Sequence, residues 1–128
     1  MSAPGSGDSR LTSVLVVDDA LFMRRMIRDI LDNSGRFHVA AEAASGEEAT
    51  RRYAEHRPDL VTMDLTMPGM DGIAALREIL KMDPAARIVM CSAVGQERDV
   101  LDAIAAGAVD FILKPFTPEN VIRVLDGL

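Results

Sequence analysis

The chain has 128 residues, enough for one domain that buries about two-thirds of the surface of its unfolded chain. Its composition, with 48% hydrophobic and 27% charged residues, is ordinary for a globular protein and argues against a disordered or fibrous chain. A formal net charge of −6 gives no counterion-release affinity for a phosphate backbone, so direct binding of nucleic acid is not expected.

The single cysteine and the N-terminal composition bear on the compartment. Cys91 has no partner for an internal disulfide, and its place in an apolar run predicts a buried, inert thiol. No apolar stretch near the N-terminus has the length of a signal peptide or a membrane span. We therefore expect a cytoplasmic protein without a membrane segment. Residues 1–10 are small and polar and predict a flexible tail ahead of one domain over 11–128.

Short apolar runs alternate with segments of helical period along the rest of the chain. The runs predict strands at 13–17, 37–43, 60–63, 87–92 and 109–113. The other segments predict helices at about 20–33, 46–57, 72–82, 96–106 and 118–127. Strands that are nearly all apolar are typical of a parallel sheet with helices on both faces. The pattern predicts an α/β protein with a five-stranded parallel, doubly wound sheet of the flavodoxin-like type.

Local signals support several helix boundaries. Ser45 followed by Glu48 is typical of a capping box at a helix start. Thr117 followed by Pro118 is typical of an N-cap with proline in the first turn, and Gly107 is a stop signal for the preceding helix.

Polar residues stand where the predicted strands end. Asp18 and Asp19 end the first strand, Asp64 ends the third, Ser92 ends the fourth and Lys114 follows the fifth. In an open parallel sheet, ligands bind beyond the carboxyl ends of the strands, where the strand order changes direction. With the order 2-1-3-4-5 the first and third strands are neighbours, so three carboxylates converge on one pocket.

A cluster of carboxylates needs a cation. Two unit charges about 4 Å apart repel by roughly 4 kcal/mol at an effective dielectric constant near 20. Carboxylate oxygens with retained waters are the ligands that Mg²⁺ prefers. Lys114 and Ser92 can bind phosphate oxygens. These groups together predict a phosphoryl-transfer site in which an aspartate is the nucleophile.

The motifs that carry these residues resemble those of the response-regulator receiver domain, with most similarity to its stand-alone chemotaxis (CheY-like) type. They are "VVDD" at 16–19, "MDLTMPGMDG" at 63–72, "SA" at 92–93 and "LKPF" at 113–116. All four match the family in order and spacing. Each motif alone is weak evidence, whereas the four together are highly specific.

The resemblance implies roles for the acidic residues. Asp64 would be the phosphoacceptor. The side chains of Asp19 and Asp64 and the backbone carbonyl of Thr66 would hold Mg²⁺, and Asp18 would act on the metal through water.

The resemblance also implies roles for the residues that follow the fourth and fifth strands. Lys114 would bind the phosphoryl group and Ser92 would be the switch hydroxyl. Phe111 would be the switch aromatic, without the hydroxyl of the tyrosine that many relatives carry there. The Lys114–Pro115 peptide bond is expected to be cis.

The function implied is a phosphorylation-activated switch rather than an enzyme with a substrate of its own. A sensor histidine kinase would supply the phosphoryl group, with catalysis limited to the protein's own phosphoryl transfer and dephosphorylation. The face built from the fourth helix, fifth strand and fifth helix would then change shape and bind a downstream protein, with chemotaxis as a candidate pathway. A monomer is expected, with dimerisation on activation as the alternative.

Several residues also have simpler interpretations. Asp19 could cap a helix that begins at Ala20, since aspartate is a preferred N-cap. Asp71 before Gly72 is best interpreted as a turn or cap residue, and Phe111 taken alone as a core side chain.

Three other functions compete with the switch. A phosphatase of the haloacid-dehalogenase type would need a second acid where the chain has Thr66. A flavin mononucleotide-binding protein would need a phosphate-binding loop rich in Gly, Ser or Thr after the first strand, and that loop is missing. The chain could also be the receiver portion of a longer regulator with an output domain.

Overall fold

The computed structural model describes residues 11–128, and the expected tail, 1–10, lies outside the described residues. The strands are β2 (Thr12–Val17), β3 (Phe37–Ala43), β4 (Leu60–Asp64), β5 (Ile88–Ser92) and β6 (Asp110–Leu113). The helices are α1 (Leu21–Ser34), α2 (Gly46–His56), α3 (Gly72–Met82), α4 (Glu97–Ala106) and α5 (Pro118–Asp126). Every predicted element is present, because apolar periodicity distinguishes buried strands from amphipathic helices over these lengths.

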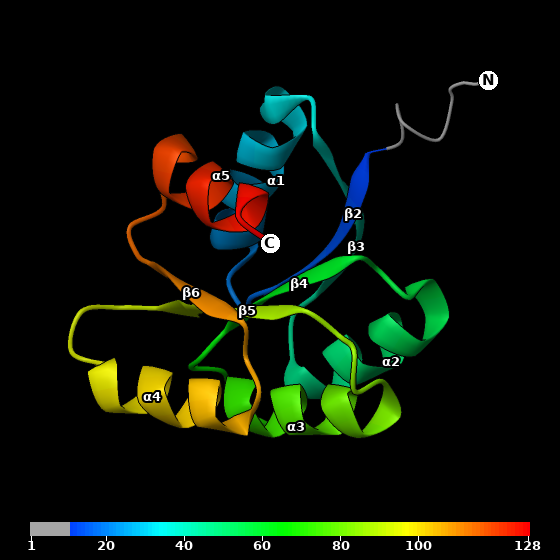
Figure 1. Cartoon of the computed structure of the whole chain (residues 1–128), viewed down its shortest axis with the longest axis vertical. Helices are drawn as coiled ribbons and strands as arrows, with labels where there is room; N and C mark the ends of the chain where they lie inside the picture. Colours follow the sequence, from blue (N-terminus) through cyan, green and yellow to red (C-terminus); the bar gives the residue numbers. More distant parts are fainter. Residues whose placement is uncertain (1–10) are drawn as a thin grey trace.

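The five strands form one parallel sheet in the order β3-β2-β4-β5-β6. This is the predicted order 2-1-3-4-5, and the predicted fold class is confirmed. Helices α1 and α5 cover one face of the sheet, and α2, α3 and α4 cover the other (Figure 1). The change of direction in strand order falls between β2 and β4, so the carboxyl ends of these two strands border the crevice in which such sheets bind ligands.

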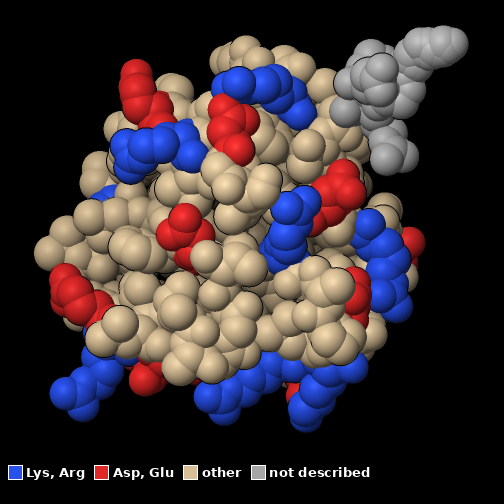
Figure 2. Space-filling view, viewed as in Figure 1, with Lys and Arg blue, Asp and Glu red and all other residues tan. Residues whose placement is uncertain are grey.

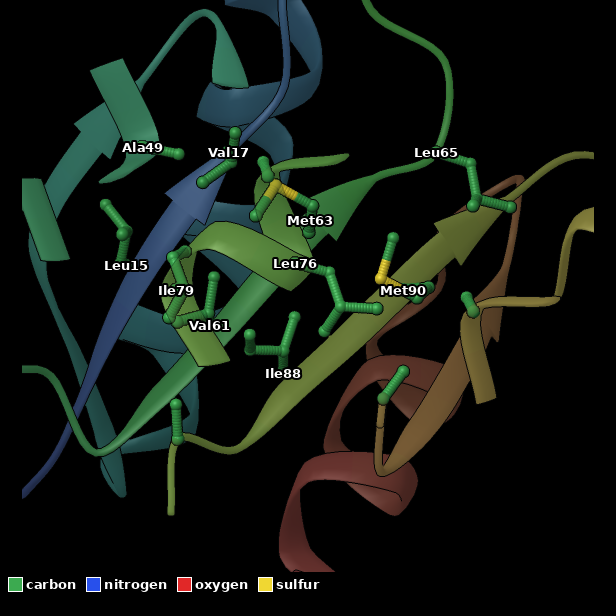
Figure 3. Packing of buried hydrophobic residues seen from close by; sticks show 14 of the residues in the cluster. Leu15, Val17, Ala49, Val61, Met63, Leu65, Leu76, Ile79, Ile88 and Met90 are labelled. Atoms are coloured by element: carbon green, nitrogen blue, oxygen red, sulfur yellow. The ribbon is translucent and has the colours of Figure 1, made fainter. Parts of the chain in front are cut away.

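Two apolar cores lie on either side of the sheet, because successive side chains of a strand point to opposite faces. Leu15 and Val17 of β2 belong to the core under α2, α3 and α4, which also contains Met63 and Leu76 (Figure 3). Val14 and Val16 belong to the core under α1 and α5. Each large side chain buried in this way stabilises the fold by about 1.5–3 kcal/mol relative to exposure.

Side chains cap several helices as the sequence indicates. Ser45 accepts a hydrogen bond from the Glu48 backbone N–H, but the Glu48 carboxylate accepts from the N–H of Ala44 instead of Ser45. The capping box is therefore present in a form shifted by one residue. Thr117 caps α5 with Pro118 in its first turn, and Gly107 ends α4. Asp71 caps α3 by accepting from the N–H of Ala74, as expected.

The start of α1 differs from the prediction that Asp19 could cap it. Ala20 is the N-cap residue, and no side chain makes a capping hydrogen bond there. The Asp18 carboxylate instead accepts from the Ala20 N–H at 2.9 Å, which turns the chain between β2 and α1. Asp19 is thereby left exposed at the turn rather than folded onto the helix end.

The surface is mixed in charge. On the face seen in Figure 2, acidic and basic side chains are interspersed in the upper half, and below them lies an uncharged area that is bordered by basic side chains at the lower margin. Within residues 11–128, no helix has both the length and the apolar character needed to cross a membrane.

Gly72 fixes how closely α3 approaches the end of β4. A Cβ atom at this position would overlap the backbone oxygen of Asp64 and lie 2.9 Å from the Leu65 Cα. Both contacts are with backbone, which cannot rotate away. Only glycine therefore lets the first turn of α3 pack directly against the strand end that carries Asp64.

We predict that Gly72→Ala lowers the free energy of unfolding by about 1–3 kcal/mol, because the added methyl group overpacks this contact. Gly127→Ala is the matched control, since a Cβ there would lie 3.5 Å from its nearest neighbour, the Val124 oxygen. The control is expected to stay within about 0.5 kcal/mol of the wild type. Urea denaturation measures both variants, and equal stability of Gly72→Ala and wild type would show that this contact is not tight.

Candidate functional site

Strand register brings the acidic residues together. In the pairing of β2 with β4, Val17 lies opposite Met63, so the next residues, Asp18 and Asp64, follow at the same edge of the sheet. Both side chains are buried, with exposed fractions of 3% for Asp18 and 8% for Asp64. Asp19 lies at the exposed rim beside them. Carboxylate oxygens of the three residues lie within 4.8 Å of one another.

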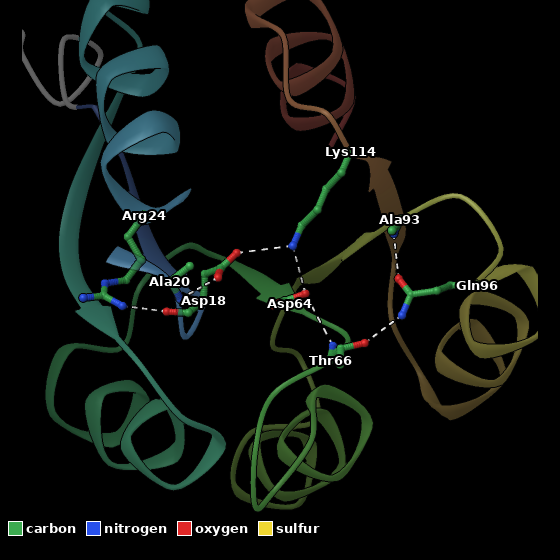
Figure 4. A network of polar contacts seen from close by, with 8 residues as sticks. All are labelled: Asp18, Ala20, Arg24, Asp64, Thr66, Ala93, Gln96 and Lys114. Carbon is green, nitrogen blue, oxygen red and sulfur yellow. Dashed lines mark hydrogen bonds and ion pairs between the residues drawn. The ribbon is translucent and has the colours of Figure 1, made fainter. Parts of the chain in front are cut away.

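Lys114 is the cation of this pocket. Its Nζ lies 3.2 Å from Asp64 Oδ1 and 3.5 Å from Asp18 Oδ2 (Figure 4). The backbone directs the side chain there, since the Lys114 N–H donates to the Ser92 carbonyl at 2.7 Å and continues the pairing of β6 with β5. The Lys114–Pro115 peptide bond is cis. One lysine neutralises only one of three carboxylates, so the pocket retains negative charge.

The pKa values of the pocket follow from burial and charge. Burial, together with the neighbouring Asp18 carboxylate, raises the pKa of Asp64 above its ordinary 3.8, although Lys114 acts in the opposite direction. Burial alone would lower the pKa of Lys114, but the charges of Asp64 and Asp18 outweigh it and raise that pKa. Lys114 is therefore a firmly held cation, whereas the ionised form of Asp64 is held at a cost in free energy.

A second set of charges holds the turn that carries Asp18 and Asp19. Arg24 of α1 donates to the Asp18 backbone carbonyl at 2.7 Å (Figure 4). The Arg24 guanidinium also contacts the Glu42 carboxylate at 3.0 Å, and Arg28 contacts the other oxygen of Glu42 at 2.7 Å. This chain of ion pairs fixes the turn against β3 and α1, so the acidic side chains are presented from a rigid backbone.

Ser92 and Phe111 lie on the other side of the pocket. Cys91 pairs with Asp64, so Ser92 is one residue beyond the Asp64 position on the neighbouring strand, and its side chain is buried. Phe111 is 42% exposed, so the interpretation of it as a core side chain is wrong. Strand β6 is the edge of the sheet, and Phe111 faces a groove of about 330 Å³ that Ser92 and Leu101 also line. Cys91 is buried, as expected, and burial raises the pKa of its thiol.

Two residues that the sequence patterns did not single out for the site belong to its rim. The side chain of Gln96 contacts both the Thr66 hydroxyl and the Ala93 backbone N–H (Figure 4). Arg24, described above, is the other. Neither carries a motif of its own, and only the folded loops show what they contact.

The protein has a parallel sheet in this strand order, with carboxylates at the ends of β2 and β4 and a lysine after β6. This arrangement is typical of a class of domains that accept a phosphoryl group. Residues 14–126 match the response regulator receiver domain, and the chain belongs to this family. The resemblance indicated by the motifs is thus confirmed.

Relatives of known type support this assignment. The chain is 58% identical to the chemotaxis protein CheY of Bacillus subtilis over 113 residues, which is 88% of this chain and 93% of that protein. It is 55% identical to CheY of Thermotoga maritima over the same shares of both chains. A chain in the crystal structure of the CheX–CheY–BeF₃–Mg²⁺ complex of Borrelia burgdorferi is 38% identical, with a TM-score of 0.87 and coverage of 95% of this chain and 92% of that one.

The raised pKa of Asp64 leads to a prediction about stability. A group whose pKa is higher in the folded than in the unfolded protein stabilises the fold below its ordinary pKa, and this contribution is lost as the pH rises through the folded value. At neutral pH the ionised Asp64 therefore lowers stability. In metal-free buffer, Asp64→Asn should raise the melting temperature at neutral pH, and the gain should shrink toward zero in acid.

Thermal unfolding across a pH series measures this effect. Asp71→Asn is the control, because Asp71 is an exposed helix cap and asparagine caps helices equally well. The control should show no comparable gain at neutral pH. A lower melting temperature for Asp64→Asn than for wild type at neutral pH would contradict the interpretation of the pocket as electrostatically strained.

Proposed function

We propose that this chain is a phosphorylation-activated response regulator of a two-component system that accepts a phosphoryl group on Asp64. The observation that carries the proposal is the contact of Lys114 Nζ with both Asp64 and Asp18, because it brings a buried carboxylate nucleophile and a phosphate-binding cation to one strand edge. The family and its chemotaxis relatives support the same function.

In the transfer, a carboxylate oxygen of Asp64 attacks the phosphorus atom of the donor. The bond from phosphorus to the donor's imidazole nitrogen breaks, and the electron pair leaves with the imidazole. The Lys114 ammonium binds an oxygen of the transferred group and stabilises its charge. Water later attacks the phosphorus atom, the bond from phosphorus to the Asp64 oxygen breaks, and inorganic phosphate leaves the restored Asp64 carboxylate. We propose that catalysis by this protein is limited to its own phosphorylation and dephosphorylation.

The donor set fits Mg²⁺. The oxygens of three carboxylates lie close together, and such hard oxygen ligands are those that Mg²⁺ prefers. Lys114 balances only part of their negative charge. In the proposed site, the side chains of Asp19 and Asp64 and the Thr66 backbone carbonyl would hold the ion, and Asp18 would act through water. The bound ion would supply positive charge that neutralises the phosphoryl oxygens.

The proposed switch uses Ser92 and Phe111. A phosphoryl group on Asp64 adds charge next to the buried Ser92 hydroxyl, which can donate a charge-assisted hydrogen bond worth about 1.5–3 kcal/mol. The groove lined by Ser92 and Phe111 lies between α4 and β6, which are part of the proposed binding face, so movement of Ser92 would reshape it. Shifting the ratio of active to inactive conformers of this face from 1:99 to 99:1 requires a differential stabilisation of about 5.5 kcal/mol.

The proposed partners follow from this arrangement. A sensor histidine kinase supplies the phosphoryl group, and a downstream protein binds the face of α4, β6 and α5. The similar CheY structure from B. burgdorferi is a complex with CheX, a protein partner. The names of the relatives favour chemotaxis as the pathway. We propose a cytoplasmic monomer that does not bind nucleic acid.

Incubation with acetyl phosphate and Mg²⁺, followed by intact mass spectrometry, tests the assignment of Asp64. Wild type should gain one phosphoryl group, which is lost in base as expected for an acyl phosphate. Asp64→Asn should gain none, and Asp71→Asn, the exposed control, should be labelled like wild type. Labelling of Asp64→Asn at the wild-type level would disprove the assignment.

Mg²⁺ titration tests the proposed ligands. Asp19→Ala should bind the ion at least about tenfold more weakly than wild type, because it removes a direct carboxylate ligand. Asp110→Ala removes a carboxylate from β6, away from the pocket, and should leave the affinity unchanged. Equal affinity of wild type and Asp19→Ala, by calorimetry or NMR titration, would remove Asp19 from the ligand set.

A further inference from the structure

The side chain of Gln96 joins the two loops that border the acidic pocket. Its Oε1 accepts from the Ala93 backbone N–H at 2.6 Å, and its Nε2 donates to the Thr66 hydroxyl at 2.7 Å (Figure 4). Thr66 follows Asp64 by two residues, and Ala93 directly follows Ser92. We call these two hydrogen bonds the Gln96 bridge. It connects the loop after the phosphoacceptor strand with the loop after the Ser92 strand.

The direction of both hydrogen bonds is determined by chemistry. A backbone N–H can only donate, so the carboxamide oxygen of Gln96 must face Ala93 and its nitrogen must face Thr66. The Thr66 oxygen accepts in this bond. Gln96 is also the N-cap residue of α4, yet no side-chain capping hydrogen bond forms there. Its carboxamide therefore forms hydrogen bonds with the two loops rather than with the backbone at the helix end.

The bridge occupies a donor that a phosphorylated site can use. The Ala93 N–H is the first backbone donor beyond the end of β5, next to the strand that carries Asp64. Phosphorylation brings anionic oxygens to this edge, and such oxygens attract N–H groups more strongly than a neutral carboxamide does. Gln96 and the incoming phosphoryl group therefore compete for the Ala93 N–H.

We propose that Gln96 is a positioning residue that holds the Ala93 N–H and the Thr66 hydroxyl in the unphosphorylated protein and thereby slows phosphoryl transfer to Asp64. This inference rests on the proposed function. A side chain that releases the N–H speeds transfer, and one that holds it more tightly slows transfer.

Two variants of Gln96 test the proposal in opposite directions. Gln96→Met keeps an unbranched side chain but has no strong acceptor for the Ala93 N–H. Gln96→Glu is isosteric and offers a charged acceptor, so it holds the N–H more strongly. With acetyl phosphate and saturating Mg²⁺, at an ionic strength that screens long-range charge, Gln96→Met should be phosphorylated about threefold to tenfold faster than wild type. Gln96→Glu should be slower than wild type by a similar factor.

The order of the rates separates positioning from a structural role. Loosening or distortion of the loop would slow both variants, whereas the proposal requires Gln96→Met to be fastest and Gln96→Glu slowest. Equal rates, or slowing of both, would overturn it. Gln96→Glu retains the shape of the side chain, so its rate tests the proposal even where Gln96→Met is less stable.

NMR of the unphosphorylated protein supplies a readout that needs no phosphoryl transfer. The Ala93 amide should exchange its proton faster in Gln96→Met than in wild type, and unchanged exchange would overturn the proposal. If wild type gains no phosphoryl group at all, the proposed function fails and this inference with it. If wild type is labelled at Asp64 but the three rates are equal, only the inference fails.

Discussion

The convergence of three carboxylates on one lysine is the interaction on which the candidate site depends. Asp18 and Asp64 are buried and Asp19 lies at the rim, while Lys114 is the cation that contacts both buried acids. Such a pocket is electrostatically incomplete, because the charge of one lysine cannot balance three carboxylates. The excess negative charge suits the pocket to a divalent cation, and burial, together with the neighbouring Asp18 carboxylate, raises the pKa of Asp64.

The fold holds these charges together against their repulsion. Parallel register places the ends of β2 and β4 side by side, and the apolar cores on both faces keep the sheet from relaxing. Gly72 lets α3 pack directly against the Asp64 backbone, and Arg24 fixes the turn behind Asp18. The stability of the hydrophobic framework thus offsets the cost of the site, as is common where a site's electrostatics serve function.

Much of the fold and of the acid cluster could be predicted from the sequence. Apolar periodicity determines the strands and helices, and ligand-binding residues in parallel sheets gather at strand ends. The strand pattern therefore predicts that Asp64 and Lys114 lie at the same edge of the sheet, whereas the contact between them is seen only in the structure. The prediction that Asp19 could cap α1 failed because the Asp18 side chain makes the local turn instead. Phe111 is exposed because β6 is an edge strand, and the interpretation as a core side chain considered its apolar residue type without this edge position.

The contacts around the rim could not be predicted. Gln96 and Thr66 are 30 residues apart, and their hydrogen bond depends on the conformation of two loops that have no periodic pattern. The link between Arg24 and the Asp18 carbonyl likewise joins a side chain to a backbone group, which leaves no signature in residue type.

A crystal structure of the protein with BeF₃⁻ and Mg²⁺ tests whether Asp64 is the phosphoacceptor, because BeF₃⁻ binds a reactive carboxylate as an analogue of the phosphoryl group. We expect beryllium to be bonded to an Asp64 oxygen, with a fluorine atom in contact with Lys114 and Mg²⁺ bound by Asp19 and Asp64. Density for BeF₃⁻ on another carboxylate, or a Lys114 side chain directed away from it, would contradict the proposed roles of Asp64 and Lys114.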